Sequence, residues 1–235
     1  MVIGAGNGGL AAALTLADAG KKVLLAERHN LPGGFATSFV RGRFEFEASL
    51  HELCDMGTPG NSGNLYALFE ELGVLDKIEF VTVPEAYRVI TLDTGEDYSM
   101  PFGVQNFIDK MESYVPGSRE STTTFFALAD ECRRAMAYLT KMRGNPDTAV
   151  LKSEYPNFMR VAAYPIDKVL NAIKMPKKAQ EIINVYWSYL GTPEDQLSFL
   201  HYAMMVNLYI THGAQIPKNR SHGISCALAD TILEK

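Results

Sequence analysis

The 235-residue sequence is poor in cysteine and tryptophan and contains no run of positive charge. Its three cysteines, Cys54, Cys132 and Cys226, are far apart and in no metal-ligand spacing. An odd number of widely spaced cysteines favours reduced thiols over a disulfide framework. We therefore expect a cytoplasmic protein that holds no metal ion.

Positive charge is scarce, because 22 lysines and arginines stand against 27 aspartates and glutamates, for a net charge of −5. A nucleic-acid-binding protein needs a basic face for the phosphates, so we expect no nucleic-acid partner. No apolar stretch is long enough to cross a bilayer, since the longest, residues 197–210, is interrupted by His201 and Asn207. Peripheral contact with a membrane stays open, and so does the oligomeric state.

A glycine-rich turn near residue 1 is the most informative feature of the chain. The apolar residues 1–3 lead into Gly4, Gly6 and Gly9, which form a G-x-G-x-x-G pattern. In dinucleotide-binding folds these glycines allow, in order, a tight turn, close approach of a pyrophosphate, and close packing of helix on strand. The pyrophosphate would lie over the N-terminus of the next helix, near Gly8, where free N–H groups favour an anion.

The residues after this turn predict a βαβ unit. Small and apolar residues at 10–19 predict a helix that ends at Gly20, and residues 23–26 predict a buried strand. A right-handed crossover makes the two strands parallel neighbours. Glu27 ends the second strand, where an acid binds the ribose hydroxyls of a dinucleotide. An ordinary α/β turn with an exposed glutamate is the alternative, but it leaves the coincidence of these parts unexplained.

The glycine pattern serves both FAD and NAD, and the residues after Glu27 favour FAD. Arg28 follows the acid directly, and the pair Gly33-Gly34 comes a few residues later, with Thr37 after it. Adjacent glycines let the backbone approach the middle of an extended dinucleotide, although a simple turn after Pro32 is the alternative. We predict FAD as the cofactor, bound by Gly4, Ala5, Gly6, Gly8, Gly9, Glu27, Arg28, Gly33, Gly34 and Thr37.

The remainder of the chain changes from strands to helices. Alternation predicts a hairpin at 37–46 and strands at 80–83, 87–92 and 97–100, with a short helix at 65–72. Helical patterns follow at 105–114, 121–142, 166–173, 177–190, 194–209 and 225–234. We expect three parts: an FAD-binding part at 1–75, a substrate or cap region at 76–215, and a segment at 216–235 that returns to the FAD-binding domain.

The segment VIGAGNGGLAAALTLADAGKKVLLAERHNLPGGFATSF resembles the FAD-binding N-terminus of the phytoene desaturase family, which includes carotenoid isomerase and retinol saturase. Residues 44–48 resemble the family's aromatic-acid segment. Residues 191–193, the apolar helix after them, residues 213–218 and residues 225–233 are similar to its return from the substrate region. Amine oxidases share the glycine pattern and the acid followed by Gly-Gly. The family usually has a further Gly-Gly pair where this chain has Asn219-Arg220.

This resemblance implies an α/β fold, a Rossmann-like FAD-binding βαβ unit with an inserted α+β cap region. It also implies an FAD-dependent oxidoreductase that acts on the C–C or C=C bonds of a long apolar substrate, polyene or isoprenoid-like. Family members are much longer, so we expect a fragment with an incomplete sheet that binds FAD poorly when isolated. An amine-oxidase-like flavoprotein and a truncated, non-catalytic remnant remain as alternatives. Desaturation, saturation and isomerisation are not distinguished.

Several residues are of types that are common in active sites, but no pattern around them supports a catalytic role. No catalytic residue is predicted. His51 and Glu47 lie in or after the aromatic-acid segment and are more simply structural. The histidines at 201, 212 and 222 match no metal-ligand spacing. The aromatic residues between 186 and 202 either line a tunnel for a polyene or form an ordinary core.

Overall fold

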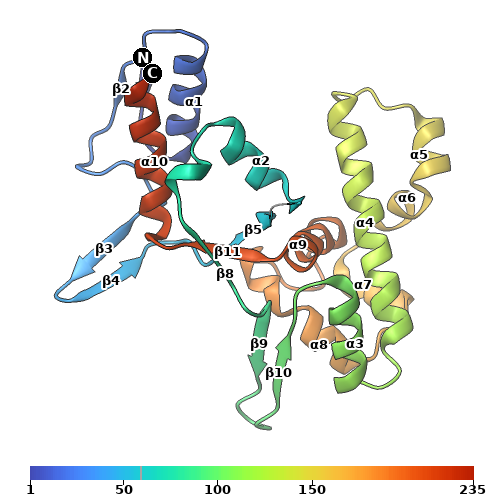
Figure 1. Cartoon of the computed structure of the whole chain (residues 1–235). Helices are drawn as coiled ribbons and strands as arrows, with labels where there is room; N and C mark the ends of the chain where they lie inside the picture. Colours follow the sequence, from blue (N-terminus) through green and yellow to red (C-terminus); the bar gives the residue numbers. More distant parts are fainter. Residues whose placement is uncertain (59) are drawn as a thin grey trace. The chain divides into compact units, whose positions relative to one another are not determined.

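The computed structural model describes residues 1–58 and 60–235, which divide into two compact units. Unit 1 comprises Met1–Val83 and His212–Lys235, and unit 2 comprises Pro84–Thr211 (Figure 1). Unit 1 is thus discontinuous in sequence, and unit 2 is inserted between its two segments. The assignment of FAD binding and substrate binding to parts of the chain stays a prediction.

Unit 1 combines short strands with three α-helices among the residues described. Its elements are β1 (Val2–Ile3), α1 (Asn7–Asp18), β2 (Leu25–Ala26), β3 (Ser38–Arg41), β4 (Phe44–Glu47), β5 (Leu53–Cys54), β6 (Gly57–Thr58), β7 (Asn61–Ser62), α2 (Asn64–Glu71), a 3₁₀ turn (Leu75–Lys77), β8 (Phe80–Thr82), β11 (Ala214–Pro217) and α10 (Arg220–Glu234).

Unit 2 is mainly helical. Its elements are β9 (Tyr87–Ile90), β10 (Asp97–Met100), α3 (Val104–Tyr114), α4 (Arg119–Lys141), α5 (Thr148–Glu154), α6 (Pro156–Val161), α7 (Ile166–Ala172), α8 (Lys177–Ile183), a 3₁₀ helix (Val185–Tyr189) and α9 (Phe199–His212), whose last residue belongs to unit 1.

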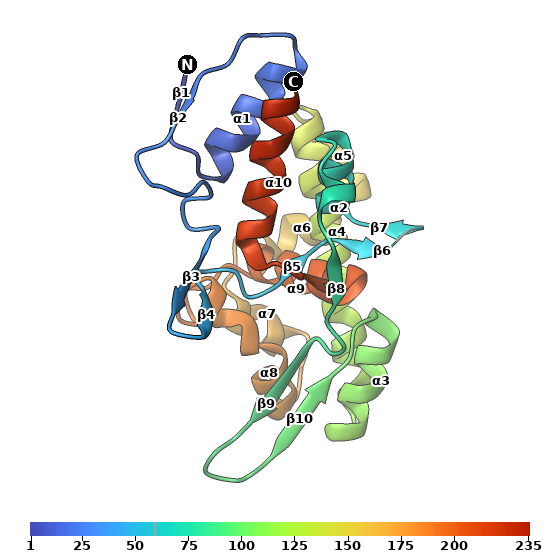
Figure 2. The ribbon, with the colours of Figure 1, turned by 60° about the vertical axis from the view of Figure 1, so that its left-hand side comes forward.

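The βαβ unit is present as predicted and confirms the Rossmann-like α/β fold. β1 and β2 are parallel, with Val2 opposite Leu25 and Ile3 opposite Ala26, and α1 connects them. α1 begins at Asn7, three residues before the predicted start, because the glycines of the turn already form its first turn. α10 packs alongside α1, as both views show (Figure 1, Figure 2).

The core of unit 1 joins three helices that are distant in sequence. Leu10 and Leu14 of α1 are fully buried against Ile224 and Leu228 of α10 and Phe69 of α2. Burial of each such side chain stabilises the fold by about 1.5–3 kcal/mol. The C-terminal helix is therefore part of the packing that supports the glycine turn.

A small antiparallel sheet brings the chain back from unit 2 to unit 1. β11 is its central strand, and Gln215 lies opposite Leu53 of β5 on one side and Thr82 of β8 on the other. The sequence predicted a return segment here but not a strand. Only a long-range pairing makes these four residues extended, and no alternation over so short a stretch indicates it.

The core of unit 2 is aromatic. Phe107, Phe125 and Phe199 are fully buried, and Phe125 meets Phe126 and Phe199 edge to face, with ring centroids 5.4 and 5.8 Å apart. Edge-to-face rings favour each other through their quadrupoles. The predicted hairpin β9–β10 and the helices α3, α4 and α7 are confirmed to within two residues at each end.

The prediction of a single helix at 177–190 is wrong. α8 ends at Ile183, and a 3₁₀ helix follows it. The hydroxyls of Tyr87 and Tyr202 donate to the carbonyls of Ile182 and Ile183, at 2.9 and 2.8 Å. These carbonyls would otherwise accept from the next helical turn, so tertiary hydrogen bonds end the helix.

The helix expected at 194–209 also begins later, at Phe199, and continues to His212. Residues 197–199 pair instead with residues 164–166. The N–H of Ile166 donates to Leu197 and the N–H of Phe199 donates to Tyr164, at 2.8 and 3.0 Å. This pairing holds the segment before Phe199 extended.

Candidate functional site

The glycine turn brings α1 into close contact with the end of β1. Gly4 has φ +93°, and a Cβ on Gly9 would collide with the Gly4 carbonyl oxygen. A side chain at Gly9 would push the helix away from the strand, whereas one at Gly4 would strain the backbone. Gly8 is exposed, with open space where a Cβ would be, so the first turn of α1 is accessible.

The N-terminus of α1 has the features of an anion site. Its N-cap residue is Gly6, which has no side chain to occupy the first N–H groups, and the first turn contains no acidic residue. The first intrahelical bond runs from Leu10 N–H to Gly6 O, at 2.9 Å. The N–H groups of Gly8 and Gly9 have no acceptor within the helix, so they could donate to a phosphate oxygen, with the helix dipole in its favour.

The Gly33-Gly34 pair lies directly against the glycine turn. The N–H of Gly33 donates to Ala5 O at 2.6 Å, and a Cβ on Gly34 would lie 3.2 Å from the Cα of Gly6. Both residues of the pair have positive φ, +117° and +62°. Two motifs separated by more than twenty residues thus form one backbone surface without side chains, which is the shape a dinucleotide pyrophosphate requires.

Glu27 is anchored at the same place. Its Oε2 accepts from the N–H of Ala5 at 2.6 Å, and its Oε1 accepts from the N–H of His29 at 2.8 Å. The backbone N–H groups of His29 and Ala5 lower the pKa of this carboxyl, so it is ionised at neutral pH. Each carboxylate oxygen keeps a lone pair, and the side chain is exposed, so it can still accept from ribose hydroxyls.

The other predicted residues have different surroundings. Ala5 is buried, and Glu27 and Gly33 engage its N–H and carbonyl groups, so it joins the parts of the site. Arg28 is exposed next to Glu27. Thr37 is half-buried, with its Oγ1 3.4 Å from Nδ1 of His222 on α10. Their contacts with a cofactor remain predictions.

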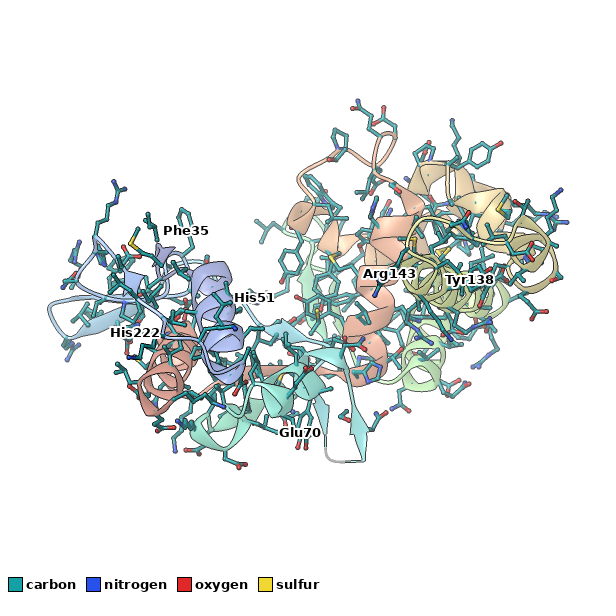
Figure 3. All side chains as sticks on the ribbon, turned by 90° about the horizontal axis from the view of Figure 1, so that it is seen from above. Phe35, His51, Glu70, Tyr138, Arg143 and His222 are labelled. Atoms are coloured by element: carbon teal, nitrogen blue, oxygen red, sulfur yellow. The ribbon has the colours of Figure 1, made fainter. Side chains whose placement is uncertain are left out.

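The sequence did not indicate that α10 holds the Gly-Gly loop. The hydroxyl of Ser225 donates to Ala36 O at 2.7 Å, and a Cβ on Gly33 would clash with Ser225 Oγ. Figure 3 shows His222, from the same helix, on unit 1. Ser225 lies almost 190 positions after Ala36 in the sequence, and no local sequence pattern indicates a contact over such a separation.

Glu47 and His51, which the sequence predicts to be structural, lie in different surroundings. Glu47 accepts from the N–H of Ser221 at 2.9 Å and from its hydroxyl, so it caps α10. His51 is exposed (Figure 3). Across 1–58 and 60–235, no group of three His, Cys, Asp or Glu side chains could hold a metal ion. Over the same residues, no helix is long and apolar enough to span a bilayer.

The parallel strand pair, the glycine turn, Glu27 and the Gly-Gly loop define a Rossmann-like dinucleotide-binding unit. In agreement, residues 2–72 match the family model described as an NAD(P)-binding Rossmann-like domain.

Over 77–100% of its length, the chain is similar to several curated enzymes. It is 23% identical over 245 residues to all-trans-retinol 13,14-reductase of Danio rerio, covering 100% of this chain and 39% of the relative. It is 27% identical over 192 residues to prolycopene isomerase 2, chloroplastic, of an Oncidium hybrid cultivar, covering 77% and 29%. It is 26% identical over 246 residues to phytoene dehydrogenase of Streptomyces griseus, covering 98% and 45%.

The predicted resemblance to the phytoene desaturase, carotenoid isomerase and retinol saturase family of FAD-dependent oxidoreductases is therefore confirmed. The chain spans between 29% and 45% of the length of these relatives.

Solved structures agree on the fold. The chain superposes on putrescine oxidase with a TM-score of 0.62 and 16% identity, over 98% of this chain and 48% of the oxidase. Cyclohexylamine oxidase from Brevibacterium oxydans gives a TM-score of 0.60 and 18% identity, over 98% and 48%. At such identities the likeness concerns architecture alone.

Proposed function

We propose that the chain binds the adenosine and pyrophosphate half of FAD, in an oxidoreductase that acts on C–C or C=C bonds of a long apolar polyene or isoprenoid-like substrate. The observation that carries the cofactor is the contact between Gly33-Gly34 and the glycine turn at Gly6. The substrate class rests on the relatives, since the retinol, prolycopene and phytoene in their names are all apolar polyenes or precursors of polyenes.

The residues present fit such a cofactor. Glu27 would accept from the ribose hydroxyls, the first turn of α1 would hold the pyrophosphate, and the Gly-Gly loop would cover it. When bound, the flavin would supply the redox chemistry, while the protein supplies binding, orientation and an apolar site. In this proposal unit 1 binds FAD and unit 2 binds substrate, in a cytoplasmic protein.

Two alternatives differ in their support. An amine-oxidase-like flavoprotein is favoured by the architecture of putrescine oxidase and cyclohexylamine oxidase alone. One specific observation favours the alternative of a non-catalytic protein. The chain is 21% identical over 243 residues to a Danio rerio relative named inactive all-trans-retinol 13,14-reductase. Nucleotide binding without turnover would favour this last reading.

The cofactor proposal is tested by titrating the purified chain with FAD, ADP, NAD⁺ and FMN in a calorimeter. FAD and ADP should bind with similar, weak affinity, because every predicted contact lies on the adenosine and pyrophosphate half. FMN should not bind. A preference for NAD⁺ over FAD, or binding of FMN but not ADP, would overturn the proposal.

A matched pair of variants locates the site. Glu27→Gln should weaken ADP binding about tenfold, the size expected for a lost charge-assisted hydrogen bond. Glu70→Gln changes an equally exposed glutamate on α2 and should bind like the unchanged chain. Equal loss in both variants would argue against a role for Glu27 in nucleotide binding.

The substrate class has its own test in the single tryptophan, Trp187. Trp187 is 44% exposed and lies in unit 2, the proposed substrate region. Retinol should quench its fluorescence saturably, whereas putrescine should not. The reverse result would favour the amine-oxidase alternative.

A further inference from the structure

The loop that carries Gly33 and Gly34 lies between two partners within unit 1. On one side it meets the glycine turn, where the N–H of Gly33 donates to Ala5 O at 2.6 Å. A Cβ on Gly34 would lie 3.2 Å from the Cα of Gly6. On the other side the loop meets α10, because a Cβ on Gly33 would lie 2.6 Å from the Oγ of Ser225. The position of α10 therefore limits how far the loop can move away from the glycine turn.

Ser225 links α10 to this loop through one hydrogen bond. Ser225 is fully buried, and its hydroxyl donates to Ala36 O at 2.7 Å. The N–H of Ala36 in turn donates to Gly33 O at 2.9 Å, which closes a tight turn over residues 33–36. A single hydroxyl on α10 thus holds the carbonyl at the end of the turn that presents the glycine pair.

The first turns of α10 are themselves attached to unit 1 by neighbouring contacts. Glu47 of β4 accepts from the N–H of Ser221 at 2.9 Å, and Thr37 Oγ1 lies 3.4 Å from Nδ1 of His222. Ser221 and Ser225 are four residues apart, so they lie on the same face of the helix. Both are buried. Ser225 therefore donates from a helix whose position is set by contacts other than its own.

The two halves of the proposed nucleotide site depend on α10 to different degrees. Glu27, which would accept from the ribose hydroxyls, accepts from the N–H groups of Ala5 and His29, and neither bond involves α10. The Gly-Gly loop, which would cover the pyrophosphate, is held on one side by Ser225. Removal of the Ser225 hydroxyl should therefore affect the phosphate half of the site more than the ribose half.

We propose that Ser225 is a positioning residue of the nucleotide site, which holds the Gly33-Gly34 loop at the spacing from the glycine turn that a pyrophosphate group requires. Ser225 acts through Ala36 and Gly33, and not by contact with the nucleotide. The inference rests on the proposed function and adds that the preference for phosphate-bearing nucleotides depends on α10. Without the hydroxyl, a ligand that needs the loop must supply the free energy that orders it.

The test compares ADP with adenosine as ligands of the whole 235-residue chain, with affinities measured by NMR titration. Ser225→Ala should weaken ADP binding about fivefold, the fold-change equivalent to one ordinary hydrogen bond. Adenosine has no pyrophosphate, so it should bind the variant and the unchanged chain equally. Glu27→Gln should instead weaken the binding of both ligands, because both contain the ribose.

A second measurement needs no nucleotide. Amide hydrogen exchange reports the bond from the Gly33 N–H to Ala5 O, and Ser225→Ala should accelerate exchange of this amide about fivefold. If the unchanged chain bound neither ADP nor adenosine, the proposed function would fail. The exchange rate of Gly33 would still show whether Ser225 holds the loop.

Thr231 provides a matched control on the same helix. It is 3% exposed, and its hydroxyl donates to Ala227 O within α10 at 2.7 Å. Thr231→Val removes a buried hydroxyl that does not bond to the loop, so ADP binding and Gly33 exchange should stay unchanged. Ser225→Cys retains a side chain of similar size with only a weak donor, so it should change ADP binding in the same direction if Ser225→Ala does not fold.

The proposal is overturned if Ser225→Ala weakens ADP and adenosine binding equally, because the hydroxyl would then support folding alone. It is also overturned if Thr231→Val has the same effect as Ser225→Ala. A third contrary result is that neither Ser225→Ala nor Ser225→Cys changes ADP binding or the exchange of the Gly33 amide.

Discussion

Arg220 occupies a backbone conformation that side chains other than glycine rarely adopt. It is the first residue of α10 and has φ +58°. The left-handed region costs a residue with a Cβ about 1–2 kcal/mol. Arg220 therefore accepts backbone strain at the start of α10. The ion pair of Arg220 with Glu45 offsets part of that cost at most, because both side chains are largely exposed.

Substitutions at Arg220 should reverse the usual order of glycine and alanine in a helix. Arg220→Gly should be more stable than Arg220→Ala by about 1 kcal/mol, because only glycine relieves the strain. The measurement is chemical unfolding followed by circular dichroism.

Arg119 provides the matched control, because it also begins a helix, α4, and also makes an exposed ion pair, with Asp109. Its φ is not positive. There Arg119→Gly should be less stable than Arg119→Ala by about 0.5–1 kcal/mol. The same order at both positions would show that Arg220 is not strained.

The lowered pKa of Glu27 would set the pH dependence of the proposed nucleotide site. Hydrogen bonds from His29 and Ala5 stabilise the ionised form, so the folded pKa lies below 4.5. The contribution of this carboxylate is complete above 4.5 and is lost only as pH falls through the folded value. As far as the protonation of Glu27 is concerned, ADP affinity should therefore be constant between about pH 5 and pH 8. Below about pH 5 the affinity should decrease. Glu27→Gln should abolish the fall, and circular dichroism would show whether the chain remains folded.

At the scale of elements, α6 depends on a buried carboxylate from another helix. Glu131 of α4 is 8% exposed and accepts from the N–H groups of Asn157 and Phe158, at 2.6 and 2.9 Å, and from the Asn157 side chain. These are the first N–H groups of α6 after Pro156, which has none to donate. Glu131 thus acts as an N-cap supplied from a distance.

Glu131→Ala should cost about 2–3 kcal/mol of stability, because the buried N–H of Phe158 and the half-buried N–H of Asn157 would both lose their acceptor. Glu120→Ala, at an exposed site in the first turn of the same helix, should cost less than about 1 kcal/mol. Thermal unfolding compares the two. A similar small loss in both would mean that water replaces Glu131 as the acceptor.

Elements with their own periodicity and stop signals were predictable, and those that depend on distant partners were not. The hairpin around Gly42 and the helix that ends before Gly73 follow from local patterns. α5 and α6, of seven and six residues, were not predicted from the sequence. The break after Ile183 was missed because tyrosines from other segments cause it.

The same distinction applies to the site. Gly4, Gly6, Gly9 and Glu27 could be predicted because the fingerprint spans one local βαβ unit. The support from Ser225 and the cap at Glu47 could not, since each joins segments more than 170 residues apart. Local patterns thus predicted the glycine turn and its acid, whereas the fold was needed to show which distant residues hold them in place.

At the scale of the whole molecule, unit 2 is one continuous segment and unit 1 is not. A chain of residues 84–211 should fold alone, with helical circular dichroism and a cooperative melt, because its aromatic core lies within the segment. A chain of residues 1–83 should not fold, because it lacks α10 and leaves Leu10 and Leu14 uncovered. Cooperative folding of 1–83 would contradict the role given to α10.

The strands that lead into and out of unit 2 are hydrogen-bonded neighbours, since Thr82 of β8 lies opposite Gln215 of β11 and Val83 N–H donates to Ala214 O. The segment between β8 and β11 therefore connects two paired antiparallel strands, as a hairpin loop does. The entropy cost of closing a loop rises only slowly with its length. A tight Asn-Gly turn grafted between these strands should therefore yield a miniature nucleotide binder. By the same geometry, evolution could exchange the whole inserted segment while leaving the phosphate cradle intact.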